Sequence, residues 1–173
     1  MTNVMKTTTI LSVIILFLSV ITACEDKDYP TGLPEYDNHY YIAYVPYNNS
    51  KVTVNRNQAG LVKFPVQFHS AFTREYNAVG MYTLNTTGIA NPAVLGQDFN
   101  IVDKNGNVIQ PTDGKYSMTF PQAKKVRDTI YVKLLNSVTP GTRTIEINLI
   151  ENVTPQYSVD TMSTAFKRPL EIR

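Results

Sequence analysis

The chain has 173 residues, of which 43% are hydrophobic and 17% are charged, and its formal net charge is +2. Its basic residues are scattered, and the one cluster, residues 124–127, is typical of a solvated turn. This excludes the stripe of positive charge that nucleic-acid binding requires. With a single cysteine the chain cannot form an internal disulfide, so its stability must come from packing.

The first 23 residues have the pattern of a secretory signal peptide. Lys6 precedes an almost entirely apolar run over residues 10–21, and the exit Ile21-Thr22-Ala23-Cys24 follows. The run is about a dozen residues long, whereas a membrane-spanning helix needs roughly 20. The exit resembles the lipobox of bacterial lipoproteins, which implies that Cys24 is lipidated and becomes the first mature residue. The alternative is an ordinary free thiol. Several acyl chains together give stable membrane anchoring.

Residues 24–38 form an acidic segment with two prolines and no apolar alternation, which is typical of a semi-rigid tether. Glu25, Asp26 and Asp28 directly follow the cysteine. This cluster resembles the surface-export signal of Bacteroidetes lipoproteins, whereas the alternative is a soluble linker. The resemblance implies a protein of the outer membrane that faces the cell exterior.

Residues 39–173 predict one all-β domain. Removing residues 1–23 leaves about 150 residues, which fits a single domain. Tyr, Val, Ile and Thr are plentiful and favour a pleated, half-buried surface, and no long window has a helical apolar period. Turn signals about every eight to twelve residues are typical of an antiparallel, immunoglobulin-like β-sandwich. Strands are predicted at residues 41–45, 51–55, 61–69, 78–84, 99–102, 108–109, 116–120, 129–135, 142–150 and 165–172.

Residues 61–69 show the clearest alternation of apolar and polar side chains. Pro65 interrupts that run and lacks the backbone donor of a sheet ladder, so this strand is expected at an edge or beside a bulge. Asn105-Gly106 predicts a hairpin turn, and Pro140-Gly141 predicts a second turn. The expected core consists of Val62, Phe64, Val66, Phe68, Tyr82, Leu84, Phe99, Phe120, Ile130, Val132, Ile145, Ile147 and Leu149.

Four short motifs of the second half occur in the order found in Calx-beta domains. They are Gly96-Gln97-Asp98-Phe99, Met118-Thr119-Phe120, Thr129-Ile130-Tyr131-Val132, and Gly141 followed by Ile145, Ile147 and Leu149. The chain also resembles small lipoproteins encoded beside Bacteroidetes glycan-uptake (Sus-type) systems. Some Calx-beta domains bind calcium, but Asp98 has no acidic companions here, and calcium needs six to eight oxygen ligands. Asp98 is therefore expected to accept hydrogen bonds from loop amides, and no metal or cofactor is expected.

No constellation for catalysis stands out. Glycoside hydrolysis needs two carboxyls about 5–9 Å apart, and no second carboxyl is marked to accompany Glu146. His39 and His69 are the only histidines, and Ser70 lacks the context of a nucleophile. The chain is therefore expected not to be an enzyme.

Tyrosines gather around the first predicted strand, at Tyr36, Tyr40, Tyr41, Tyr44 and Tyr47. One interpretation is a stacking surface for sugars, with contacts from Tyr36, Tyr40, Tyr44 and Tyr47. The alternative is that these rings cap an edge of the sandwich, with an apolar ring and a hydrated hydroxyl. Two triplets, Asp128-Thr129-Ile130 and Asp160-Thr161-Met162, match the acceptor pattern of Bacteroidetes O-glycosylation. Thr161, which is expected in a loop, is the better candidate, and Thr129 is expected at a strand start.

Together these features predict an outer-membrane lipoprotein that acts as a non-catalytic binding or accessory module, for example in glycan capture. Its expected partners are the membrane, through the lipid anchor, and a glycan or outer-membrane transport proteins. The alternative is a structural or adhesion protein that contacts other surface proteins through its sheet edges.

Overall fold

The computed structural model describes residues 38–173. The predicted signal peptide, Cys24, the acidic cluster Glu25, Asp26 and Asp28, and Tyr36 lie outside the described residues. Within residues 38–173 almost all regular structure is β, and the single helical element is the short 3-10 helix η1 (Pro121–Ala123). This part of the chain contains no helix that is long and apolar enough to cross a membrane.

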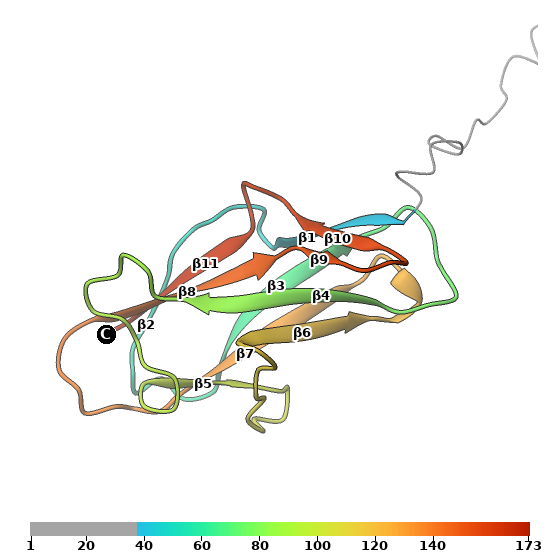
Figure 1. The fold of residues 1–173 in the computed structure, drawn as a ribbon. Helices are drawn as coiled ribbons and strands as arrows, with labels where there is room; N and C mark the ends of the chain where they lie inside the picture. The colour runs from blue at the N-terminus through green and yellow to red at the C-terminus, as the bar shows by residue number, and fades with distance from the viewer. Residues whose placement is uncertain (1–37) are drawn as a thin grey trace, which may run out of the picture. The chain divides into compact units, whose positions relative to one another are not determined.

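The strands follow one another along the chain as shown in Figure 1. They are β1 (His39–Tyr44), β2 (Val52–Val54), β3 (Leu61–His69), β4 (Ala78–Asn85), β5 (Phe99–Val102), β6 (Lys115–Phe120), β7 (Arg127–Leu134), β8 (Arg143–Ile150), β9 (Asn152–Val153), β10 (Ser158–Thr161) and β11 (Lys167–Ile172).

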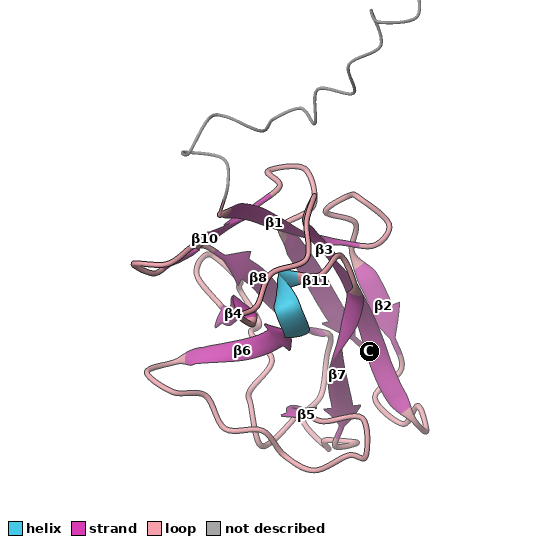
Figure 2. Ribbon diagram, turned by 90° about the vertical axis from the view of Figure 1, so that its right-hand side faces the viewer, coloured by secondary structure: helices cyan, strands magenta, loops and turns pink. Residues whose placement is uncertain are grey.

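Two sheets face each other and form a β-sandwich, which confirms the predicted fold class (Figure 2). The six-stranded sheet has the order β5-β7-β3-β1-β10-β9, and the five-stranded sheet has the order β2-β11-β8-β4-β6. Most neighbouring strands are antiparallel. Two pairs, β1 with β10 and β11 with β2, are parallel, a feature that the sequence pattern did not indicate.

The core lies between the sheets, and strand alternation builds it. Every residue of the expected core is buried or packs against the buried cluster, with Leu84 in the second group. Phe68 of β3 and Phe120 of β6 stack across the two sheets, with ring centroids 4.5 Å apart. Burial of such rings contributes roughly 1.5–3 kcal/mol each, so these contacts hold the two layers together.

The expectation for Pro65 is wrong, because β3 lies inside its sheet between β7 and β1. The Pro65 carbonyl accepts a hydrogen bond from Val45, directly after β1 ends at Tyr44. In a strand the nitrogen and the carbonyl of one residue point to the same side. The backbone nitrogen of Pro65, which carries no hydrogen, therefore faces the end of β1. No further residue of β1 lies there to accept a hydrogen bond from it.

The two predicted turns differ in what they connect. Asn105-Gly106 lies in a tight turn, in which the Asp103 carboxylate accepts hydrogen bonds from the Asn105 and Asn107 amides at 2.8 and 2.9 Å. The predicted return strand is reduced to one bridge between Val102 and Val108. Pro140-Gly141 lies in the connection from β7 to β8, which belong to opposite sheets, so it carries the chain across the sandwich.

Candidate functional site: an aromatic face on the first strand

The predicted tyrosine cluster is divided by the alternation of β1. Tyr40 and Tyr44 are 3% and 0% exposed, so the expectation that they contact sugar is wrong. Their side chains point into the sandwich together with that of Ile42, because all three occupy alternate positions. The Tyr44 hydroxyl donates to the Ile147 carbonyl at 3.0 Å, and the Tyr40 hydroxyl is 2.6 Å from that of Tyr76. Both rings therefore belong to the core.

The exposed aromatic surface is formed by the residues on the other side of β1 and by its neighbours. Tyr41 is 41% exposed and Tyr47 is 53% exposed. His39 stacks on Tyr41 with ring centroids 5.1 Å apart, and His69 lies 5.6 Å from Tyr47. Because Tyr41 is paired with His69 across β1 and β3, the two ring pairs are neighbours. We call His39, Tyr41, Tyr47 and His69 the aromatic face.

Polar groups border the aromatic face. The Asp160 carboxylate of β10 lies 2.5 Å from Nε2 of His39, and the side chains of this pair are 31% and 28% exposed. His39, Tyr41 and His69, together with Lys125, line a shallow depression of about 350 Å³. The surface thus combines exposed rings with a carboxylate, which accepts hydrogen bonds, and an ammonium group, which donates them.

His69 is the member of the aromatic face with a buried polar atom. Its Nε2 is buried without a hydrogen-bond partner among the described residues. Burial lowers the pKa of His69 below its ordinary value, and the positive charge of Lys125 lowers it further. His69 is therefore held neutral at pH 7.

Two further residues, Asp98 and Glu146, were considered as candidates from the sequence. Asp98 is buried, and its carboxylate accepts a hydrogen bond from the Val94 amide at 2.8 Å. This is the loop role expected for it. Within residues 38–173, no group of three or more His, Cys, Asp or Glu side chains is close enough to hold a metal ion.

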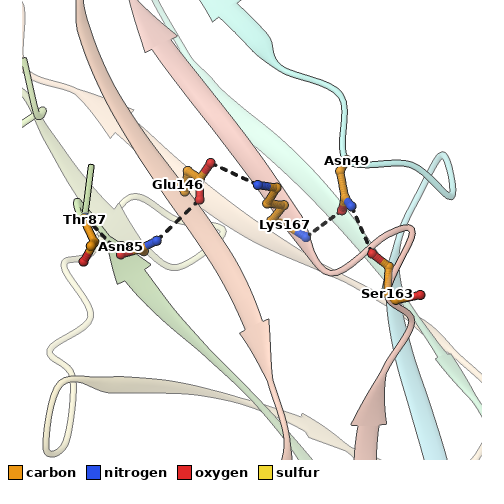
Figure 3. Close-up of polar contacts among 6 residues, drawn as sticks. All are labelled: Asn49, Asn85, Thr87, Glu146, Ser163 and Lys167. Atoms are coloured by element: carbon orange, nitrogen blue, oxygen red, sulfur yellow. Dashed lines mark hydrogen bonds and ion pairs between the residues drawn. The ribbon is translucent and has the colours of Figure 1, made fainter. Parts of the chain in front are cut away.

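Glu146 lies on the outer face of the five-stranded sheet, in a row of polar contacts (Figure 3). Its two carboxylate oxygens accept from Lys167 and Asn85, each at 3.4 Å. Asn49 continues the row, because its side-chain oxygen accepts from the Lys167 amide at 3.0 Å. Figure 3 shows one carboxylate in this row, so its geometry is that of a cross-strand polar ladder.

Both candidate O-glycosylation threonines lie in strands. Thr129 lies in β7, near its start, where it is paired with Pro65. Thr161 is not in a loop as expected. It is the last residue of β10 and is paired with Ile42. Both side chains are half-buried.

Comparison with known proteins concerns the fold alone. No protein-family profile and no curated protein matches this chain. It is similar to the crystal structure of the apo-form Calx CBD1 domain, with 18% identity, a TM-score of 0.46, and coverage of 78% of this chain and 97% of that chain. It is similar to CBD12 from CALX1.2, with 18% identity, a TM-score of 0.47, and coverage of 76% of this chain and 44% of that chain.

A third similar structure is a cohesin–dockerin complex from Clostridium thermocellum, with 12% identity, a TM-score of 0.36, and coverage of 79% of this chain and 100% of that chain. These low identities say nothing of what this chain binds.

Of the aromatic face, only Tyr47 was a predicted sugar contact. Sequence reasoning missed His39 and His69, and it placed Tyr41 in the tyrosine cluster but not among the contacts. The signal was present, because His39 and Tyr41 are two residues apart and so share one face of a strand. The contribution of His69 depends on the register between β1 and β3, which a single sequence does not reveal.

Proposed function

We propose that this protein is a lipoprotein of the bacterial outer membrane that faces the exterior and binds glycans without catalysis. The lipobox-like exit before Cys24 and the acidic cluster after it support the location. A role beside a glycan-uptake system of the Sus type is supported by the sequence resemblance described above.

The observation that carries the binding proposal is the aromatic face. Sugar rings stack on exposed aromatic rings through their apolar C–H faces, while their hydroxyls need nearby polar groups. Tyr41 and Tyr47 supply the exposed rings, and the polar groups of Asp160 and Lys125 border them. Aromatic contacts of this kind contribute about 0.5–1.5 kcal/mol beyond area burial. A shallow site with two such rings is therefore expected to bind weakly, and density of the protein on a membrane would add avidity.

The binding proposal is tested by affinity electrophoresis of the protein through gels that contain soluble polysaccharides. We expect retardation by at least one glycan, and we expect Tyr41→Ala and Tyr47→Ala each to reduce it. Tyr131→Ala is the matched control, because Tyr131 is half-buried on a different strand, β7, of the same sheet. If no polysaccharide retards the protein, or if both variants are retarded like the wild type, the glycan proposal is wrong.

The location is tested separately with Cys24→Ala. We expect this variant to be released from membranes or to remain unprocessed, because the acyl chains are the expected anchor. Replacing Glu25, Asp26 and Asp28 by alanine should leave the protein membrane-bound but protected from protease added to intact cells. A Cys24→Ala protein of mature size in the membrane fraction would contradict the lipoprotein proposal.

A further inference from the structure

Among the described strands, β6 is an edge strand of unusual length and openness. It ends the five-stranded sheet and is six residues long, while the other edge strands are β2 and β9, with three and two residues, and β5 with four. The edge of β5 is covered by bridges from Leu95 and Val108. Short or covered edges are the usual protection against unwanted pairing. β6 has neither a proline nor a glycine, and Figure 1 shows β4 beside it on one side only.

The backbone of β6 has a definite open side. Lys115 exchanges hydrogen bonds with Thr112, at 2.9 Å in each direction, across the Asp113-Gly114 turn. These groups point away from β4. Because alternate residues of a strand point their backbone groups to the same side, the N–H and C=O groups of Ser117 and Thr119 also point away from β4. No partner for these groups lies among residues 38–173.

Two cavities flank this open edge, one on each face of the sheet. The inner one, of about 330 Å³, is lined by Tyr82, Met118 and Ile130 between the two sheets. The outer one, of about 440 Å³, is lined by Met81 and Ser117 on the other face. A strand added to β6 would direct alternate side chains to opposite faces. One set of its side chains would therefore enter each cavity.

Charge indicates what kind of side chain fits. Each cavity carries two carboxylates and one ammonium group, although the whole chain has a net charge of +2. The charged residues are Asp103, Lys104 and Asp128 in the inner cavity, and Asp113, Lys115 and Glu151 in the outer one. A segment with lysine or arginine side chains is complementary to this surplus of negative charge.

We propose that β6 binds an extended, basic segment of a partner protein, which adds to the five-stranded sheet as an antiparallel strand beside Ser117 and Thr119. Main-chain hydrogen bonds would supply affinity, and the two cavities would supply specificity, as in other cases of strand addition. This site is separate from the aromatic face and does not depend on glycan binding.

The test uses the full chain in detergent with two synthetic peptides, both blocked at their ends. One consists of five Thr-Lys repeats, and the other of five Thr-Glu repeats. We expect the basic peptide to bind at least about tenfold more tightly and its affinity to fall as salt is raised. Binding should slow hydrogen exchange of the Ser117 and Thr119 amides.

Two controls separate strand addition from simple charge attraction. Ser117→Pro removes an edge donor without removing a bond to β4 and should abolish binding, whereas Ser117→Ala keeps the amide and should bind like the wild type. If Ser117→Pro does not fold, a basic peptide with N-methylated backbone amides serves instead, and it should not bind. The proposal is overturned if neither peptide binds, if Ser117→Pro or the N-methylated peptide binds normally, or if exchange slows elsewhere. It is also overturned if the protein alone protects these amides by pairing with a second copy of itself.

Discussion

The two faces of β1 carry the same kinds of side chain in opposite surroundings. On the inner face, Tyr40 and Tyr44 are buried, and their hydroxyls are occupied by Tyr76 and by the Ile147 carbonyl. On the outer face, Tyr41 is exposed and stacks on His39. The position of a tyrosine along a strand, rather than its presence in an aromatic cluster, therefore decides whether it supports the fold or is available to a ligand.

The largest expected difference in stability is between alanine substitutions of tyrosines on the two faces of this strand. Tyr44→Ala removes a ring that packs on Phe64, so we expect a loss of about 3–5 kcal/mol in the free energy of unfolding. Tyr41→Ala should cost less than about 1 kcal/mol. Urea unfolding of both variants measures the difference. Equal losses would break the division of β1 into a structural and a free face.

The same comparison extends to β11, where Arg168 points inward and Lys167 outward. Arg168 is 3% exposed, lies 5.1 Å from the Tyr44 ring centroid, and donates to Asn48 and to the Pro46 carbonyl. Arg168→Met leaves these oxygens without a donor, so we expect a loss of about 2–3 kcal/mol.

Lys167→Met is the matched control for Arg168→Met. It removes only a partly exposed ion pair with Glu146, which is worth about 1 kcal/mol or less. Thermal melts of the two variants rank them. A larger shift for Lys167→Met would contradict the assigned orientation of β11.

Gly80 tests how tightly the inner side of β1 is packed. A methyl group at Gly80 would lie 2.9 Å from Cε2 of Phe120 and 3.2 Å from Cδ1 of Ile42. We therefore expect Gly80→Ala to destabilise the fold by about 1–3 kcal/mol through overpacking. Combining it with Ile42→Val, which removes Cδ1, should cost less than the sum of the single changes. Strict additivity in urea unfolding would show that the inner face has room to spare.

The smallest expected effect is a loss of folding stability at acidic pH that depends on His69 of the aromatic face. The pKa of His69 is lowered in the folded state, so below about pH 6.5 the unfolded chain takes up a proton that the folded chain resists. Stability should therefore fall as the pH drops from 7.5 to 5.5, and His69→Gln should flatten this slope. The pKa values of Asp103 and Glu171 are also lowered, by hydrogen bonds from Asn107 and Lys51, but their contributions are lost only at lower pH, when these carboxylates are protonated. An unchanged slope in His69→Gln would contradict the burial argument.

Local patterns in the sequence were sufficient for most of the fold. The alternation over β3 and β8 predicted both strands and their buried faces, because the period of two is a property of each strand alone. β9 and β10, with two and four residues, were not predicted, because their pairing depends on contacts with distant parts of the chain. The parallel pairing of β1 with β10 has the same origin.

The candidate site was predicted less well than the fold. Tyr47 was identified correctly as exposed, but Tyr40 and Tyr44 were assigned to the surface although they alternate with Tyr41. Alternation groups the tyrosines into two sets but does not say which set faces the core. That choice depends on which face of the six-stranded sheet packs against the other sheet. Within their own sheet, β3 and β10 flank β1 and place His69 and Asp160 beside Tyr41.

The central claim is that the outer face of β1 binds a glycan while the inner face only supports the fold. Nuclear magnetic resonance of the ring signals, during titration with the polysaccharide that most retards the protein, tests it most directly. The account predicts shifts for His39, Tyr41, Tyr47 and His69 and unchanged signals for Tyr40 and Tyr44. Shifts confined to other rings, such as Tyr82 of β4 and Tyr116 of β6, would contradict it.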